Sequence, residues 1–180
     1  MLLYHGSNSV IGHIDLSRSR DRTDFGKGFY LSDKIGTAQR WAVRKVELTG
    51  GIPTILQYEI DKSLFDELSG KRFPNLPDAE WLDFICFNRR RKPADVLKKE
   101  PRHDYNWVSG PIADDDIADV VDDYMAGDID ETDAILRARA LPQTYQLSLH
   151  TIEAISFADE VNVYYKQLKK GRWSTKWIKR

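Results

Sequence analysis

Two short stretches decide the fold: Leu2-Leu3-Tyr4-His5-Gly6-Ser7 and Asp24-Phe25-Gly26-Lys27-Gly28-Phe29-Tyr30-Leu31-Ser32. Each places a polar ring residue, His5 or Tyr30, near the end of an apolar run typical of a strand, beside glycines that would let a ligand approach the backbone. The Tyr30 ring can stack on a flat heteroaromatic ligand, which is worth about 0.5–1.5 kcal/mol beyond area burial. His5 can bond a sugar hydroxyl, because imidazole both donates and accepts. The stretches therefore predict a site for a heteroaromatic ligand that carries a sugar.

The flanking sequence predicts short strands interleaved with helices. Strands are expected over 2–5, 28–32, 53–60, 105–109, 145–150 and 161–166, and helices over 36–48, 63–68, 77–91, 114–126, 131–140 and 151–158. Asp130 or Thr132 can start the fifth helix, and Gly127 suits a helix end before it. The irregular spacing favours an α+β fold over a doubly wound parallel sheet. With no evident linker, we expect one domain over 1–180, with a last strand and a basic C-terminal tail in 161–180.

Charge and cysteine content exclude several classes of protein. The chain has 27 basic and 28 acidic residues, so no whole-protein field points to nucleic acid or membrane. Local runs, basic over 89–102 and in the last fifteen residues and acidic over 114–133, are ordinarily solvated faces. The single Cys86 is expected to be a buried structural thiol. With no disulfide, apolar leader or membrane span, the chain is expected to be cytoplasmic.

The histidines are scattered without metal-ligand spacing, so no metal is expected. Gly26-Lys27-Gly28 lacks the spacing of a phosphate-binding loop. His103-Asp104 has two interpretations: an acid/base pair, or part of a structural turn with Gly110-Pro111.

The two opening stretches resemble the nicotinamide-binding half of the ADP-ribosyltransferases of the diphtheria-toxin and poly(ADP-ribose) polymerase branch. The chain is still more similar to an uncharacterised bacterial family of small ADP-ribosyltransferase-like proteins. The matching segments are Leu3 to Ser7, Asp24 to Leu31, Trp41-Ala42, His103 to Asp115 and Gln146 to Thr151. The resemblance implies a split β-sheet core with flanking helices, NAD as substrate, and the toxin of a bacterial or phage toxin–antitoxin-like pair.

The resemblance also implies roles for particular residues. His5, Tyr30 and Gln146 would be catalytic, and His5, Gly6, Ser7, Gly28, Phe29, Tyr30, Thr37 and Trp41 would bind NAD. Gly6 would read the nicotinamide carboxamide through its backbone, Thr37 would bond the same amide, and Trp41 would cover the ring, although core packing explains Trp41 equally well. Gln146 stands where many relatives have glutamate. A neutral amide can bond ribose but is a poorer base than a carboxylate.

These inferences favour transfer of a single ADP-ribose unit to a macromolecule, either protein or nucleic acid. A target-reading loop is expected over 137–145, with Arg137, Arg139, Gln143 and Tyr145 exposed. The basic run from Arg89 to Arg102 could contact phosphates, and the acidic helix over 114–126 could meet a basic antitoxin. Two alternatives remain: an NAD-, ADP-ribose- or partner-binding module without turnover, and an NAD glycohydrolase.

Overall fold

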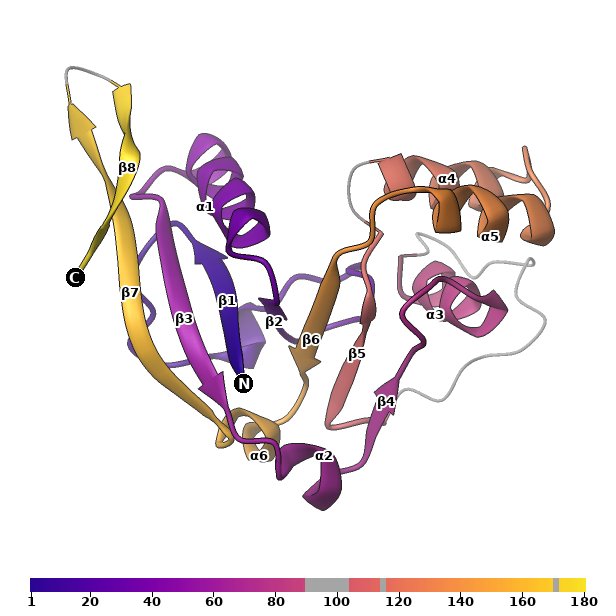
Figure 1. The fold of residues 1–180 in the computed structure, drawn as a ribbon, viewed down its shortest axis with the longest axis horizontal. Coiled ribbons are helices and arrows are strands. Elements are labelled where there is room, and N and C mark those ends of the chain that lie inside the picture. Colours follow the sequence, from indigo (N-terminus) through magenta and orange to yellow (C-terminus); the bar gives the residue numbers. More distant parts are fainter. Residues whose placement is uncertain (90–103, 114–115, 170–171) are drawn as a thin grey trace. The chain divides into compact units, whose positions relative to one another are not determined.

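The structure is a computed structural model that describes residues 1–89, 104–113, 116–169 and 172–180 (Figure 1). The chain divides into two compact units, each assembled from separated segments. Unit 1 comprises Met1–Ile14, Tyr30–Leu68 and Ile152–Arg180, and unit 2 comprises Asp15–Phe29 and Ser69–Thr151. Helices and strands are mixed in both units, which confirms the α+β class. The expectation of a single domain stays a prediction.

Unit 1 contains most of the strands. Its elements are β1 (Leu2–Ser7), β2 (Phe29–Ser32, whose first residue belongs to unit 2), α1 (Ile35–Thr49), β3 (Thr54–Ile60), α2 (Leu64–Glu67), α6 (Ile152–Ile155), β7 (Ala158–Lys169) and β8 (Arg172–Lys179). The strands run antiparallel in the order β2-β1-β3-β7-β8. Pairing of β1 with β3 is continuous from Leu2↔Glu59 to Ser7↔Thr54.

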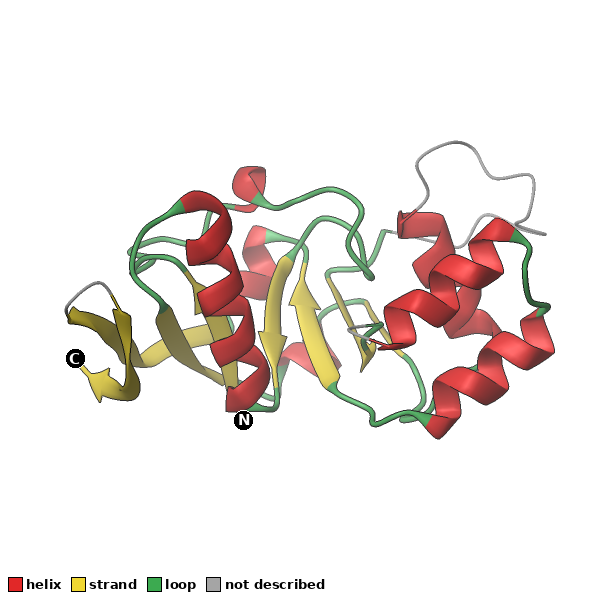
Figure 2. Ribbon diagram, turned by 90° about the horizontal axis from the view of Figure 1, so that it is seen from above, coloured by secondary structure: helices red, strands yellow, loops and turns green. Residues whose placement is uncertain are grey.

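Helix α1 lies across one face of the unit 1 strands (Figure 2). Its backbone comes so close to β1 that a Cβ atom on Gly6 would be 2.2 Å from the Ala38 carbonyl oxygen. The helix brings Ala38 and Ala42 to this contact, and both are fully packed. A glycine facing two alanines is therefore what allows the helix to pack directly on the strand.

Unit 2 packs a small group of strands against helices. Its elements are the 3-10 turn η1 (Leu16–Arg18), β4 (Gly70–Arg72), α3 (Ala79–Arg89), β5 (Trp107–Pro111), α4 (Asp116–Ala126), α5 (Glu131–Ala140) and β6 (Tyr145–Leu149). β5 pairs in parallel with β4 and antiparallel with β6. The core includes Phe25, Phe73 and Phe84, and the rings of Phe73 and Phe84 meet edge to face at 5.2 Å.

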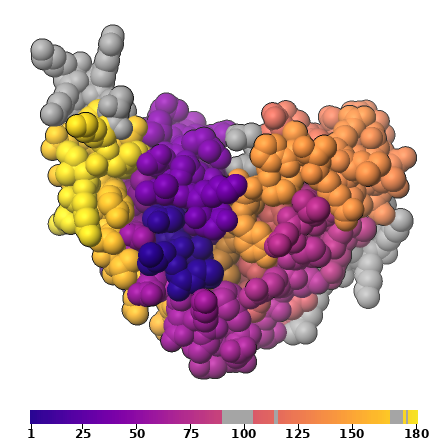
Figure 3. All heavy atoms as spheres, in the orientation of Figure 1, coloured from indigo at the N-terminus to yellow at the C-terminus, as the bar shows by residue number. Residues whose placement is uncertain are grey.

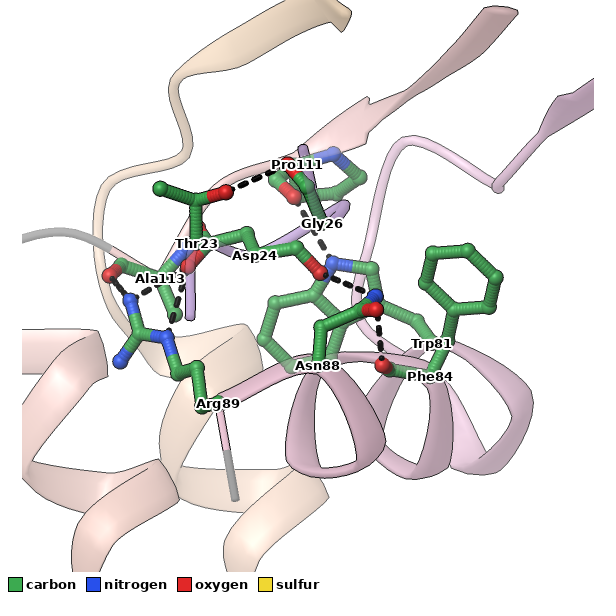
Figure 4. Close-up of polar contacts among 9 residues, drawn as sticks. All are labelled: Thr23, Asp24, Gly26, Trp81, Phe84, Asn88, Arg89, Pro111 and Ala113. Atoms are coloured by element: carbon green, nitrogen blue, oxygen red, sulfur yellow. Dashed lines mark hydrogen bonds and ion pairs between the residues drawn. The ribbon is translucent and has the colours of Figure 1, made fainter. Parts of the chain in front are cut away.

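A buried ion pair fixes the segment that carries the second motif (Figure 4). The Asp24 carboxylate accepts from Arg89 Nε at 2.7 Å and from the Ala113 N–H at 2.8 Å. Asn88 Nδ2 donates to the Asp24 carbonyl at 2.9 Å. Residues from α3 and from the chain after β5 thereby hold Asp24. Gly26, two residues further on, makes a turn at φ 80°, a conformation that favours glycine.

Helix α4 ends and helix α5 begins at the residues that the sequence predicts. The Asp130 side chain accepts from the Asp133 N–H and caps α5, and Gly127, at φ 83°, ends α4. Ile117 and Val121 of α4 are buried, while its acidic residues Asp116, Asp119, Asp122 and Asp123 are exposed. The prediction of a solvated acidic face is confirmed for these residues. Asp114 and Asp115 lie outside the described residues.

The expected basic C-terminal tail is wrong, because residues 172–179 form strand β8 paired with β7. Strand β4 was not expected from the sequence, because its three residues are too few to show alternation. The helix expected over 151–158 ends at Ile155, and β7 begins at Ala158.

The expected turn at Gly110-Pro111 is also wrong, because both residues belong to β5 and face Gln146 and Tyr145 of β6. Ile112 donates to the Thr144 carbonyl, so by alternation the Pro111 nitrogen points away from β6. On that other side of β5, strand β4 ends at Arg72, so the missing N–H of Pro111 costs no hydrogen bond between β4 and β5. The Pro111 carbonyl accepts from Trp81 Nε1 at 2.8 Å.

We predict that Asp24→Asn destabilises the fold by roughly 3 kcal/mol, because it leaves the Arg89 guanidinium partly buried without a counter-charge. Chemical denaturation measures this loss as a lower midpoint. The matched control is Asp133→Asn, which breaks the exposed pair of Arg137 with Asp133 and should cost less than about 0.5 kcal/mol. Equal losses in the two variants would show that the buried pair does not anchor the segment.

Candidate functional site

His5 lies in β1, and its imidazole ring contacts the backbone of β2. Its Nδ1 is 2.8 Å from the Tyr30 carbonyl oxygen, and its Nε2 is 3.3 Å from Lys45 Nζ on α1. A carbonyl oxygen can only accept, so Nδ1 carries the proton. Nε2 then presents a lone pair toward the Lys45 ammonium. The contacts select one tautomer of a neutral ring.

The surroundings of His5 disfavour the imidazolium. Burial, followed by the positive charge of Lys45, lowers the pKa of His5 from its ordinary 6.5 to about 3, against the opposing effect of the Tyr30 hydrogen bond. The ring is therefore neutral at physiological pH. Nε2 has a single lone pair, so a neutral His5 can accept a hydrogen bond from a ligand hydroxyl there only in place of the Lys45 ammonium.

The edge of β1 opens at Gly6. Met1 and Ile60 form a hydrogen-bonded pair, in which the N–H of each donates to the carbonyl of the other, at 2.7 and 2.8 Å. In an antiparallel ladder the backbone groups of successive residues point to alternate sides of the strand. The N–H and C=O of Gly6 therefore point away from β3. On that side, β2 pairs with β1 only at Tyr4↔Ser32. Continued register would place Tyr30 opposite Gly6, but the Tyr30 carbonyl accepts from His5 instead. The Gly6 backbone thus lies beyond the end of the β1–β2 pairing.

The two motif glycines have a structural explanation that differs from the expected one. A Cβ atom on Gly28 would be 2.2 Å from the Ser148 hydroxyl, just as one on Gly6 would meet α1. The protein itself, rather than space for a ligand, occupies the Cβ side of both residues. The expectation that a ligand approaches the backbone of these glycines stays a prediction, and their lack of a side chain is explained by packing. The predicted role of the Gly6 N–H and C=O concerns the strand edge and stays a prediction.

Gln146 lies on β6 in unit 2, opposite Gly110. The residue is only 9 % exposed, yet its side-chain amide makes no hydrogen bond with the described part of the chain. The Ser148 hydroxyl, two residues along the same strand, is fully buried without a partner among the described residues. A buried hydroxyl is ordinarily bonded, so that of Ser148 points to an additional partner, such as water or a ligand.

The predicted α1 residues lie on one helical face together with a residue that the sequence analysis missed. Thr37 is buried and its hydroxyl accepts from Arg40 Nη2 at 3.4 Å, while the half-buried Trp41 ring has the Arg44 guanidinium 5.5 Å from its centre. Lys45 follows Trp41 by four residues, as Trp41 follows Thr37. That spacing is the signal that could have identified Lys45.

The other predicted site residues of the two motifs lie in β1 and β2. Ser7 is buried and its hydroxyl accepts from the Ser9 N–H, Phe29 is buried, and Tyr30 is half-buried. Cys86 is a buried free thiol, as expected, and burial raises its pKa to about 12. Arg90 to Arg102 and His103 lie outside the described residues.

The first part of the expected target-reading loop over 137–145 is helix, since α5 continues to Ala140, and Tyr145 already belongs to β6. Arg137 and Arg139 are exposed, but Arg139 donates to the Pro77 carbonyl. Gln143 and Tyr145 are only half-buried rather than exposed, and Gln143 bonds the carbonyls of Ala138 and Leu141. The expectation of a free, exposed loop is therefore wrong for these two residues.

The fold and site define an α+β protein with a polar strand edge beside a half-buried, neutral histidine. A family model described as "Protein of unknown function (DUF3990)" matches residues 1–159, and the chain belongs to this family. No curated protein and no solved structure matches the chain.

The described residues lack both a metal-binding cluster and a membrane-spanning helix. They contain no group of three or more His, Cys, Asp or Glu side chains arranged to hold a metal ion. None of the described helices combines the length and apolar character that crossing a membrane requires.

We predict that Lys45→Met raises the pKa of His5, because it removes the nearby positive charge, while burial keeps the value below 6.5. NMR titration of the imidazole ring measures the midpoint, and Lys45→Arg, which retains the charge, should change it little. The parent His5 is deprotonated when folded, so its contribution to stability is complete above pH 6.5 and is lost as the pH falls toward 3. An unchanged midpoint in Lys45→Met would contradict the contact.

Proposed function

We propose that this chain is a mono-ADP-ribosyltransferase that cleaves the nicotinamide–ribose bond of NAD and transfers ADP-ribose to a macromolecule. One observation carries the proposal: the Gly6 backbone lies at an edge of β1 beyond the β2 pairing, next to a neutral His5. A carboxamide needs one donor and one acceptor, which a strand edge supplies through its N–H and C=O. Nicotinamide offers that group.

The charge state of His5 suits the reaction. As the glycosidic bond breaks, its electron pair moves to the nicotinamide nitrogen and positive charge grows on the ribose. The acceptor then bonds the anomeric carbon and loses its proton. A neutral His5 accepts from a ribose hydroxyl through Nε2 when the Lys45 ammonium gives up its contact with that nitrogen, and the ring itself adds no positive charge. Lys45, 3.3 Å from that nitrogen, supplies a counter-charge for the diphosphate of NAD.

The proposal assigns the other residues by resemblance. By that resemblance, Tyr30 stacks on nicotinamide, Ser7, Gly28 and Phe29 also bind NAD, and Thr37 and Trp41 contribute from α1. Gln146 bonds the ribose, and its side-chain amide, which makes no hydrogen bond with the described chain, is available for this role. The neutral amide favours transfer of single units, because it is a weak base for activating a second acceptor hydroxyl.

The cellular role remains part of the proposal. The split sheet of the ADP-ribosyltransferase fold is likewise proposed, and the mixture of strands and helices is its support. We propose a cytoplasmic toxin of a toxin–antitoxin-like pair, and the exposed acidic face of α4 is the candidate surface for a basic antitoxin. The acceptor is a protein or a nucleic acid.

A second function, an NAD-binding module without turnover, is favoured by Gln146, which lacks the negative charge that would stabilise an oxocarbenium ion. An NAD glycohydrolase would use the same site with water as the acceptor.

Incubation with NAD labelled on its adenylate side tests the proposal in a lysate divided into protein and nucleic-acid fractions. We expect label fixed in one fraction with the parent chain, and its loss with His5→Ala or Tyr30→Ala. His13→Ala, which alters an exposed histidine, should keep the parent rate. Free ADP-ribose alone would indicate a glycohydrolase, and intact NAD would favour the binding module. Equal labelling by all variants would show that the site is wrongly assigned.

Replacing Gln146 by glutamate tests its place in the reaction. We expect Gln146→Glu to raise the rate of NAD cleavage by roughly tenfold, since a carboxylate stabilises the cationic ribose and acts as a base. Gln146→Ala, which removes the amide, should lower the rate. A chromatographic assay of released nicotinamide measures both. If neither variant departs from the parent rate, Gln146 does not contact the ribose.

A further inference from the structure

The hairpin of β7 and β8 is distinct from the rest of the chain in charge, and most of it lies beyond the residues that match the family. Residues 164–180 contain seven basic residues and no acidic one, although the whole chain has a net charge of −1. The basic residues are Lys166, Lys169, Lys170, Arg172, Lys176, Lys179 and Arg180. In the space-filling view, the C-terminal residues in yellow contribute to the visible surface (Figure 3).

Strand pairing brings aromatic rings and cations to one face of this hairpin. Tyr164 pairs with Lys179, and Lys166 pairs with Trp177. Directly opposed residues share a face, and residues two apart along a strand share it as well, so all four side chains lie together. The Lys166 ammonium is 5.0 Å from the centre of the Trp177 ring. We call this set the hairpin face.

The hairpin face remains accessible and its cations are not neutralised. Tyr164, Lys166 and Trp177 are half-buried, and Lys179 is exposed. Neither Lys166 nor Lys179 forms an ion pair with the described part of the chain. The Tyr164 hydroxyl donates to Gln57 Oε1 at 3.3 Å, which fixes the position of its ring. Solvated lysines alone would explain the charge but not the two aromatic rings beside them.

We propose that the hairpin face binds single-stranded nucleic acid. Lys166 and Lys179 contact the phosphates, and unpaired bases stack on Tyr164 and Trp177. The two rings are diagonal neighbours, a relation that separates residues on adjacent strands by about 7–8 Å. An acidic peptide would satisfy the lysines but would leave the aromatic rings unused. A duplex conceals its base faces from a flat sheet, whereas single strands offer theirs for stacking.

This inference is independent of NAD chemistry. Binding is therefore measured without NAD, on the full chain, so that its failure is separable from failure of the proposed transferase activity. The probes are fluorescein-labelled single-stranded DNA and RNA of about 12 nucleotides, a length within the range of known single-strand sites. Fluorescence anisotropy at several salt concentrations gives the affinity and its salt dependence.

We expect single strands to bind with an affinity that falls as salt rises. Lys166→Gln with Lys179→Gln should reduce the slope of log K against log salt by about 1.4, because each single-strand phosphate contact contributes about 0.7. Trp177→Ala should weaken binding roughly fivefold or more, whereas Trp177→Phe retains a ring and should bind better than Trp177→Ala. Far-ultraviolet circular dichroism shows whether each variant is folded.

The matched control replaces Lys62 and Lys176 by glutamine. Both are exposed, and Lys176, one residue from Trp177, points to the other face of its strand. This variant should lose less affinity than the Lys166/Lys179 variant. Equal losses, tighter binding of a duplex, displacement by poly-glutamate at equal charge, or no binding of either single strand would each overturn the proposal.

Discussion

The hydrogen bond from the His5 ring to the Tyr30 carbonyl is the interaction on which the candidate site depends. It uses the carbonyl that continued pairing would place opposite Gly6, so the β1–β2 register is confined to Tyr4↔Ser32. It also selects the tautomer in which Nε2 accepts. One contact thus accounts for both the strand edge and the chemical state of the histidine, two features that a ligand with a carboxamide and a ribose would require.

Packing close to this contact explains the motif residues in a second way. Gly6 admits helix α1, and α1 carries Lys45, whose charge disfavours protonation of His5. In unit 2, Gly28 packs on β6, and Asp24 is bound by Arg89 and the Ala113 N–H. Residues of the two motifs therefore stabilise the fold in addition to any role in binding. Loss of activity in a motif variant has to be separated from loss of stability.

Much of the fold follows from local sequence, and the site follows only in part. Alternation and end signals located most elements, including the Asp130 cap, because these depend on neighbouring residues. β4 is too short to show a period, and the paired position of Pro111 depends on where β4 ends. Likewise, the motifs identified His5, but its tautomer and its contact with Lys45, forty residues away, arise from tertiary packing.

The most direct test of the account is an NMR titration of the isotope-labelled chain with nicotinamide alone. The account predicts saturable shifts of the Gly6 amide and the Tyr30 ring, with the His5 ring remaining neutral. Replacing nicotinamide by benzoate, which lacks the carboxamide donor, should abolish the shift at Gly6. Shifts confined to residues remote from β1, with Gly6 unchanged at saturation, would contradict the claim that this strand edge binds the carboxamide.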